Sequence, residues 1–414
     1  MLKTTFIQTC LLVACLVVML GIVPSGKAVE VADLYLVKWP VSDQNNTARW
    51  RAALAGFKEV LVRKSGSQQI LRDDGVQQAY RKVTSYLQRF EYIHQDDSNE
   101  EFPYIISLYF EPRLIDALIR EAKLPLWGSN RPLTILWLAV ESEDGRQIVG
   151  ANSDSPALQV VENNATRRGL PLITPLMDLE DELIVTTSDV WGRFSSTISQ
   201  ASQRYFSDSQ LIGKIQAMGE SWRGQFTYIN QGKELAFELS SSSQEILLAD
   251  MTDKLAELLC SKYCVVEQVG ETNEVMLRLS GVNNFVEYKA AEVYLESLSA
   301  IRKLYLVGID EHTLKIRVSL LGDLESLIKG ISLGNQMTVV ELEDRLPKQL
   351  VSDKEENDQA LIDGANILDA ESVQNESVAG SLNTTRAKTN HILSNEKEYK
   401  NKIPLEVLYY RWNG

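Results

Sequence analysis

The spacing of hydrophobic positions divides the chain into units that differ in secondary structure. In residues 29–130, apolar residues recur every second position in some stretches and every three to four positions in others, the periods of strands and helices. The predicted elements are a strand at 34–41, a helix that ends at Ser65-Gly66, a helix after Asp74 that carries Leu87 and Phe90, a strand at 104–110 and a helix at 113–124. We therefore expect a small N-terminal α+β domain.

The next predicted domain, residues 131–245, opens with a nearly continuous apolar run. Residues 133–140 have the pattern of a strand that is buried on both faces. The elements predicted after it are a helix at 155–168, a strand at 170–174, a helix at 189–206, a strand at 210–216 and an antiparallel pair at 225–229 and 234–239. The alternating order predicts a central α/β domain with a parallel sheet and helices on its faces.

Residues 246–346 have the clearest predicted topology. After a helix that holds Cys260, we expect a strand at 275–279, a helix from Asn284, a hairpin of 304–309 with 314–320, a short helix from Asp323 and a strand at 337–342. This β-α-β-β-α-β order is that of the ferredoxin-like split motif. The fold class expected for the whole chain is therefore α+β with α/β.

The end of the chain combines two opposite patterns. Residues 347–398 contain no Phe, Trp or Tyr and are rich in Asp, Glu, Asn, Ser and Ala. Because such a composition buries too little apolar surface to fold alone, we expect a disordered acidic segment. Residues 399–414 return to a strand pattern with Tyr409, Tyr410 and Trp412. We expect this closing strand to dock on a folded sheet; the alternative is a free peptide that recruits a partner by strand addition.

The first 28 residues have the pattern of a secretory signal peptide. Lys3 precedes an apolar run from Cys10 to Val23, and the ending Gly26-Lys27-Ala28 predicts cleavage after Ala28. The run is shorter than the roughly 20 residues that a membrane-spanning helix needs. The prediction is a periplasmic protein. The alternatives are an uncleaved segment that anchors the protein in the inner membrane, and a lipoprotein acylated at Cys15.

The charge of the chain narrows its expected partners. The formal net charge is −14 at pH 7, and loss of residues 1–28, which contain Lys3 and Lys27 and no acid, takes −14 to −16. Because so acidic a surface repels phosphate groups, nucleic acid is not expected as a partner. Contact with a membrane is expected only through an uncleaved N-terminal segment. The expected partner is an envelope protein whose identity the sequence does not give.

Cys260 and Cys264 are the only cysteines outside the predicted leader. In an oxidising compartment they are candidates for a disulfide. Three residues separate them, whereas a redox-active pair has two intervening residues. Since the loop they would close is very short, we expect the bond to act as a local clip with a small effect on stability.

The chain contains no recognisable catalytic or cofactor motif. The histidines are not at metal-binding spacings, and the sequence has no Gly-x-Ser-x-Gly elbow, phosphate loop or dinucleotide fingerprint. Ser326 and Lys329 match a Ser-x-x-Lys pattern, but no Lys-Thr-Gly accompanies them and an ordinary amphipathic helix explains them. We therefore predict no metal and no cofactor, and we favour a protein that is not an enzyme.

Two features remain as candidate ligand sites. Asp178 and Asp181 follow the predicted strand at 170–174, and carboxylates beyond the carboxyl end of a parallel strand could hold a cation or transfer protons. Trp191 lies in the first turn of a predicted helix and could stack on a ligand. Each has a structural alternative: a solvated acidic loop for the two aspartates, and a cap on the core for the indole.

Several segments, taken in order, resemble an exported Gram-negative family, the domain of unknown function 2066. The resemblance rests on Tyr35–Val41, Ala52–Leu54 with Ser65-Gly66, Arg168–Leu172, Pro175–Leu179, Ser188–Gly192, Ala201–Tyr205 and Tyr410–Trp412. It spans most of the chain outside the acidic segment and implies export, but no activity. At the level of fold, the helix at 189–206 and the strand after it are also similar to the amino-terminal domain of TolB-type envelope accessory proteins.

Taken together, these features favour a non-catalytic periplasmic protein that binds partners in the assembly or maintenance of the cell envelope. One alternative is a hydrolase or another enzyme that acts on an envelope substrate through Asp178 and Asp181. The other is a carrier of a small ligand, which would need an enclosed pocket near Trp191.

Overall fold

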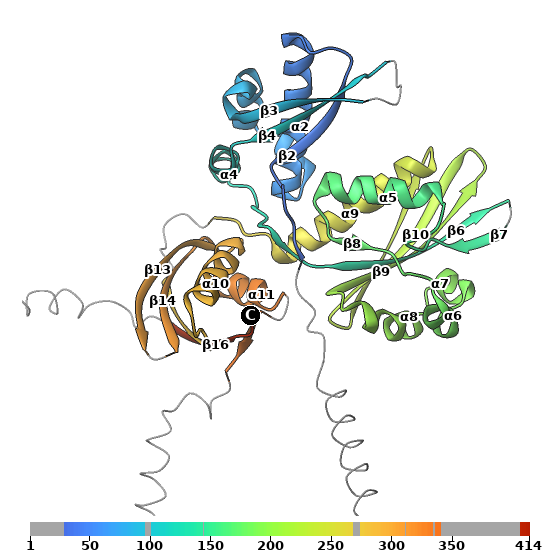
Figure 1. Cartoon of the computed structure of the whole chain (residues 1–414). Coiled ribbons are helices and arrows are strands. Elements are labelled where there is room, and N and C mark those ends of the chain that lie inside the picture. Colours follow the sequence, from blue (N-terminus) through green and yellow to red (C-terminus); the bar gives the residue numbers. More distant parts are fainter. Residues whose placement is uncertain are drawn as a thin grey trace, which may run out of the picture.

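The computed structural model describes residues 29–95, 101–143, 145–267, 274–310, 312–333, 336–340 and 406–414. Within them the chain has a mixed α+β architecture with a three-stranded, a six-stranded and a five-stranded sheet and a small two-stranded ribbon (Figure 1). The predicted leader with Ala28 and the predicted acidic segment 347–398 lie outside the described residues. Of the helices described, none is both long and apolar enough to cross a membrane.

The N-terminal unit, residues 29–128, is an antiparallel sheet in the order β2-β4-β3 with helices packed against it. Its elements are β1 (Val29–Glu30), β2 (Leu36–Val41), α2 (Asn46–Ser65), η1 (Gln68–Arg72), α3 (Asp74–Ala79), η2 (Tyr80–Tyr86), β3 (Leu87–His94), β4 (Tyr104–Phe110) and α4 (Pro112–Glu121). The Asn45 side chain caps α2 by accepting from the Ala48 N–H, and Gly66 ends it with a φ of 70°. Phe57 and Leu61 of α2 are fully buried in the core of this unit.

The helix predicted to carry Leu87 and Phe90 is wrong in its second half. Helix α3 ends at Ala79, and Leu87 begins strand β3, which pairs with β4 along its length. Phe90 is 45% exposed. The stretch contains both helical and alternating spacings, and the cross-strand contacts with β4 decide between them.

The central unit is built on a sheet in the order β11-β10-β9-β6-β7, with β8 also paired to β6. Its elements are β5 (Asn130–Arg131), β6 (Thr134–Ser142), β7 (Gly145–Ile148), α5 (Pro156–Arg168), β8 (Leu172–Ile173), α6 (Leu179–Ile184), α7 (Thr187–Gly192), α8 (Ser195–Ser202), η3 (Gln203–Tyr205), β9 (Ser209–Met218), β10 (Ser221–Asn230), β11 (Lys233–Ser241) and α9 (Gln244–Tyr263). The expectation of a parallel sheet holds only for β6 with β8 and β9. The other neighbours are antiparallel, because short turns such as Gln231-Gly232, both at positive φ, join them.

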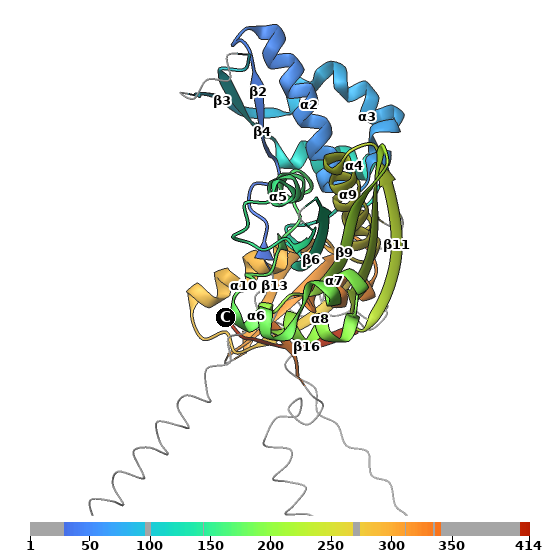
Figure 2. The ribbon, with the colours of Figure 1, turned by 90° about the vertical axis from the view of Figure 1, so that its right-hand side faces the viewer.

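Helices cover both faces of this sheet, α5 and α9 on one and α6, α7 and α8 on the other (Figures 1 and 2). Alternate side chains of strand β6 point to the two faces. Leu136 and Leu138 pack in the core with α5 and α9. Ile135 and Trp137 pack in the core with α7 and α8. The prediction of a strand buried on both faces is therefore confirmed.

Two helix predictions in this region need correction. The helix expected over 189–206 is divided into α7, α8 and η3, because Arg193 ends α7 in the left-handed conformation with a φ of 57°. The helix that holds Cys260 was placed with residues 246–346, yet α9 packs Leu255 and Leu259 into the core of the central sheet. In the structure, the central unit therefore extends to Tyr263.

The C-terminal unit, residues 274–340 with 406–414, is a sheet in the order β13-β14-β12-β16-β15. Its elements are β12 (Glu274–Ser280), α10 (Phe285–Ser297), β13 (Ile301–Asp310), β14 (Thr313–Leu320), α11 (Leu324–Ile331), β15 (Met337–Val339) and β16 (Glu406–Trp412). The β-α-β-β-α-β order is present. The closing strand β16 inserts between β12 and β15, parallel to the first and antiparallel to the second, and buries Tyr410 and Trp412. The closing strand thus docks on a folded sheet, as expected.

Candidate functional site

Asp178 and Asp181 lie at the start of α6 and are bound by two residues of η3. Asp178 caps the helix by accepting from the Asp181 N–H. The Arg204 guanidinium donates to both carboxylates, at 2.6 and 2.8 Å from the oxygens of Asp178 and at 3.2 Å from Asp181 Oδ1. The other oxygen of Asp181 accepts from the Tyr205 hydroxyl and from the Met177 N–H. The two aspartates therefore connect α6 to η3.

The electrostatics of this cluster match that structural role. Hydrogen bonding to Arg204 lowers the pKa of the exposed Asp178 carboxyl to about 2, and the same contacts raise the pKa of Arg204. Burial and the hydrogen bond to Asp181 raise the pKa of Tyr205 to about 12. Since Arg204 occupies the space between the two carboxylates, a cation would have to displace it. Cation binding by Asp178 and Asp181 stays a prediction.

Trp191, in α7, is partly buried against the core on this side of the sheet. Arg146 lies 3.9 Å from the centre of its ring and the Lys214 ammonium lies 5.2 Å from it. Burial, followed by the charges of Arg193 and Arg146, lowers the pKa of Lys214. The indole thus packs between cations of β7 and β9, an arrangement that a stacked ligand would have to replace. Ligand stacking on Trp191 likewise stays a prediction.

Both candidate features lie among α6, α7 and η3 on one side of the central sheet (Figure 1). The carboxylates of the first form ion pairs with Arg204, and the second presents cations. Among the residues that the structure describes, no group of three or more His, Cys, Asp or Glu side chains could hold a metal ion. The arrangement of these side chains gives neither feature a nucleophile paired with a base.

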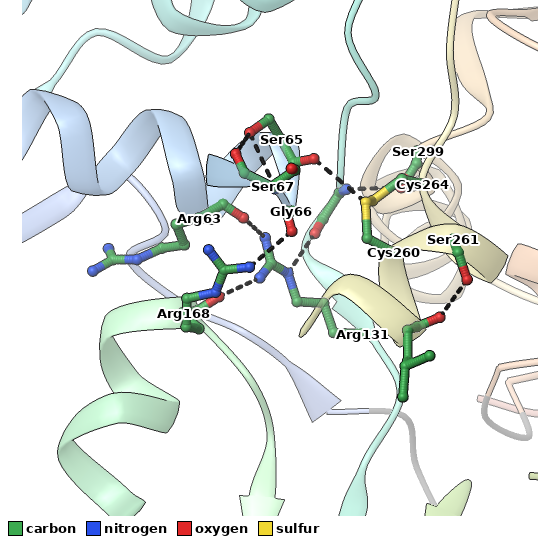
Figure 3. Close-up of a disulfide and its surroundings, with 12 residues drawn as sticks. Arg63, Ser65, Gly66, Ser67, Arg131, Arg168, Cys260, Ser261, Cys264 and Ser299 are labelled. Carbon is green, nitrogen blue, oxygen red and sulfur yellow. Dashed lines mark hydrogen bonds between the residues drawn. A yellow bond between two sulfur atoms is a disulfide. The ribbon is translucent and has the colours of Figure 1, made fainter. Parts of the chain in front are cut away.

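A cluster of buried arginines lies where the N-terminal and central units meet (Figure 3). Arg63, Arg131 and Arg168 are at most 5% exposed. Arg131 donates to the carbonyls of Gly128, Arg168, Gly169 and Arg63, all within 3.0 Å, and its guanidinium lies over the Trp127 ring. Burial lowers the pKa of Arg131, and its two arginine neighbours lower it further. This side chain holds three separate segments of backbone together.

The other two arginines bind across the same junction. Arg63, in the last turn of α2, donates to the Arg167 carbonyl of α5 and to the carbonyls of Leu34 and Leu36. Arg168, in the last turn of α5, donates to the Gly66 carbonyl at the end of α2, and its Nε lies 3.3 Å from Asp253 of α9. Most of these donors bind backbone carbonyls or a carboxylate, although Arg168 Nη1 is buried without a hydrogen-bond partner among the described atoms. Because the bonds cross the junction, the cluster has a structural role.

The disulfide between Cys260 and Cys264 packs against this junction. Cys260 Sγ lies 3.4 Å from the Ser65 carbonyl oxygen, and a Cβ built on Gly66 would approach Cys260 Cβ to 2.5 Å. Gly66 therefore lets the end of α2 lie directly on the disulfide (Figure 3). The bond closes a short loop, as the sequence suggested, yet its surroundings make it part of a contact between two units.

The boundary of the first of these units is also visible in a comparison with known families. Residues 28–128 match a domain of unknown function (DUF8605). No curated protein matches the chain. The match is to DUF8605 and does not bear on DUF2066 or on export. The DUF8605 segment ends beside Trp127, on which Arg131 stacks.

A cavity of about 650 Å³ lies between the DUF8605 segment and the central unit. The DUF8605 side contributes Leu34, Leu36, Lys38, Glu59 and Arg63, and the central side contributes Asn163, Thr166, Arg167, Gly169, Leu170 and Pro171. Arg63 is already bound to Glu59 and to three carbonyls. Because Arg63 is engaged and most of the exposed lining is apolar, we assign the cavity no ligand.

Apart from Gly66, no sequence pattern indicates this junction. Buried arginines that bind carbonyls have the same local sequence as surface arginines at the ends of helices, and only the tertiary contacts separate the two cases. The one usable signal was Gly66, because a glycine that ends a helix often permits a close approach of another segment as well as a turn.

Proposed function

We propose that this protein is an exported, non-catalytic binding protein, and that it recruits a partner in the cell envelope through the outer edge of strand β13. The observation that carries the proposal is the exposure of apolar side chains along this edge. Strand β13 lies at one end of the five-stranded sheet and pairs with β14 alone among the described strands. Tyr305, Leu306 and Val307 are consecutive and each is at least 44% exposed, and Ile309 is 59% exposed.

Helix α10 extends this apolar surface. It packs on β13, and it exposes Phe285, Val286 and Val293 to 73, 76 and 52%. The Val282 N–H donates to the His312 carbonyl, so the segment that leads into α10 lies beside the turn between β13 and β14. Phe285 and Ile309 are therefore at the same end of the unit. Exposed apolar side chains gathered on neighbouring elements are typical of an interaction site.

The chemistry of a free strand edge indicates the kind of partner. The N–H and C=O groups on the outer side of an edge strand can pair with an added strand, and exposed alternate side chains supply contacts on both faces. Strand β11, the corresponding edge of the central sheet, has Leu235 as its one large exposed apolar side chain, beside the charged residues Lys233, Glu234 and Glu238. An extended, apolar segment of another protein would fit β13 and would not fit β11.

The remaining parts of the proposal rest on the sequence. Export is inferred from the signal-peptide pattern of residues 1–28, and the Cys260–Cys264 disulfide is consistent with an oxidising compartment such as the periplasm. The resemblance to domain of unknown function 2066 supports the same compartment. We also propose that the C-terminal unit is a ferredoxin-like fold enlarged by one strand, β16.

Cross-linking in intact cells tests the proposal. The wild-type chain, the double variant Leu306→Lys/Val307→Lys and the control Leu235→Lys would each be cross-linked, purified and analysed by mass spectrometry. All three substitutions are at exposed positions, so each variant is expected to fold like the wild type, which thermal unfolding would verify. We expect one envelope protein to be recovered with the wild type and the control and lost with the double variant. Equal recovery with the double variant, or no repeated envelope partner, would overturn the proposal.

A further inference from the structure

The five-stranded sheet has a second unusual surface, the face opposite α10 and α11. Side chains alternate along its strands, so that Leu277, Ile316 and Tyr410 pack in the core under the two helices while their neighbours point to the other side. Within the described residues, no helix covers that side. We call it the open face, and its cations are Arg278, Lys303, Lys315, Arg317 and Arg411.

The open face is basic in a chain that is acidic overall. Its described strands contribute five cations against two carboxylates, Glu274 and Asp310, and only Asp310 is paired there, with Lys315. Arg278 lies over the Tyr409 ring and Lys303 over the Tyr305 ring, at 5.6 and 5.0 Å. No described carboxylate pairs with Arg278, Lys303 or Arg317, and the Arg317 Nε is buried without a hydrogen-bond partner among the described atoms.

We propose that residues 353–376 of this same chain dock on the open face. This stretch contains eight carboxylates and one basic residue, Lys354. The carboxylates are Asp353, Glu355, Glu356, Asp358, Asp363, Asp369, Glu371 and Glu376. A stretch with a formal charge of −7 therefore complements a face with a formal charge of +3. The proposal rests on charge and not on the apolar edge of β13, although Tyr305 belongs to both the edge and the open face.

The connectivity of the chain places this stretch within reach. The connection between β15 and β16 leaves the sheet after Val339 and returns to it at Glu406, on neighbouring strands whose register pairs Val339 with Tyr410. Asp353 lies 13 positions beyond Val340, a stretch that can span up to about 43 Å when extended. Five strands spaced about 4.8 Å apart give a face roughly 19 Å across. Every cation of the open face is thus accessible to the tethered stretch.

Tethering also favours this stretch over other polyanions. A segment attached to the same sheet has an effective concentration of about 1 mM, which an external acidic ligand rarely reaches. An external polyanion would in addition approach a chain of net charge −14. The intramolecular contact has the entropic advantage, and the contact is made of exposed ion pairs that salt should weaken.

Carbodiimide cross-linking tests the contact directly, because it joins only carboxylates and amines that touch. The full chain would be treated in its disulfide-bonded form, as a mixture of isotope-labelled and unlabelled protein. The paired Asp310 and Lys315 supply an internal positive control, and the exposed Lys233 on β11 supplies a negative control. We expect cross-links from Lys303 or Lys315 to residues 353–376 within one copy, and their loss at 0.5 M salt, a condition of strong screening. Cross-links to Lys233 in equal yield, or only between two copies, would overturn the proposal.

A second measurement distinguishes docking of the acidic stretch from protection of the open face by another molecule. The eight carboxylates would be changed to their amides, Asp→Asn and Glu→Gln, which leaves every residue of the sheet intact. The acetylation rate of Lys303 in the wild type should be lower than in this variant by on the order of fivefold, since several weak ion pairs act together in a tethered segment. The Lys233 rate should not change. Equal Lys303 rates in the two proteins would overturn the proposal, including the case in which another molecule protects the face.

Discussion

The central and C-terminal sheets are similar in strand number and differ in how they are covered. The central sheet has helices on both faces, and six consecutive residues of β6, from Thr134 to Ala139, are buried. The C-terminal sheet has helices on one face, and β12 alternates between buried residues and residues in contact with solvent. Among the described residues, both faces of the first sheet are covered by helices, whereas the second sheet has one face and one outer edge in contact with solvent.

The edge strands β11 and β13 of the two sheets also differ in their exposed side chains. Strand β11 presents charged residues beside Leu235, and strand β13 presents Tyr305, Leu306 and Val307 in succession. Edge strands that need no partner are usually protected by charges. The difference is the basis for our proposal that a partner binds the C-terminal unit, while the buried arginines and the disulfide connect the N-terminal and central units.

The largest expected effect is the loss of the C-terminal sheet, with the central sheet intact, when the closing strand is removed. Removal of residues 406–414 takes an inner strand from the C-terminal sheet together with the buried Tyr410 and Trp412. Each buried aromatic is worth about 3–5 kcal/mol, so the loss approaches the whole stability of a small unit. Amide hydrogen exchange should show that β12 and β15 lose protection while β6 and β9 keep theirs. Retained protection of β12 would show that the sheet does not depend on its closing strand.

A pair of single substitutions compares covered and open faces. Trp137 is fully buried in the central sheet and donates to Ser202 Oγ, and Tyr305 is 44% exposed on β13. Trp137→Ala should lower the free energy of unfolding by about 3–5 kcal/mol, and Tyr305→Ala by less than about 1 kcal/mol. Urea unfolding measures both. Similar losses would mean that the C-terminal sheet is covered in solution as fully as the central one.

The rigidity of the junction is tested with two glycines that share a left-handed conformation. Gly66 has a φ of 70° and packs on Cys260, and Gly219 has a φ of 66° with open space around it. Gly66→Ala should cost about 2–4 kcal/mol, because backbone strain adds to overlap with the disulfide. Gly219→Ala should cost only the strain, about 1 kcal/mol. Equal costs would show that the disulfide yields and that the junction is not tightly packed.

The smallest effect concerns the acidic cluster on the central sheet. The pKa of Asp178 is depressed to about 2, so its contribution to stability is present above its ordinary pKa of about 3.9 and is lost as the pH falls through about 2. An NMR titration should give a midpoint near pH 2 in the wild type and a higher one in Arg204→Gln. Asp189, whose pKa is lowered by Thr186 instead, should titrate identically in both proteins. An unchanged Asp178 midpoint in Arg204→Gln would contradict the ion pair.

Those parts of the fold that depend on local pattern could be predicted from the sequence. The strand at 104–110, the helix that Gly66 ends, and the caps Asn284 and Asp323 are present where expected. Failures occurred where a tertiary contact decides between two local options. Leu87 belongs to a strand because β4 is beside it, and the helix after Asp189 is broken because Arg193 adopts a positive φ.

The candidate sites show the same limit. Asp178, Asp181 and Trp191 were singled out for their side-chain chemistry, but Arg204 and Arg146, which bind them, are distant in sequence. Buried Arg131 and Arg168 carry no local signature, since their partners are carbonyls from other segments. Exposure of the β13 edge depends on strand order, which pattern alone does not give for a sheet that receives its inner strand from the end of the chain.

One measurement tests most directly whether the C-terminal sheet is the binding surface. A photo-reactive amino acid would be placed in living cells at Val307 on β13 or at Leu235 on β11, two edge positions that are 50 and 45% exposed. We predict a discrete adduct with one envelope protein from position 307 and none from position 235. Adducts from both positions in equal yield, or from position 235 alone, would contradict the division between a closed central sheet and a binding C-terminal sheet.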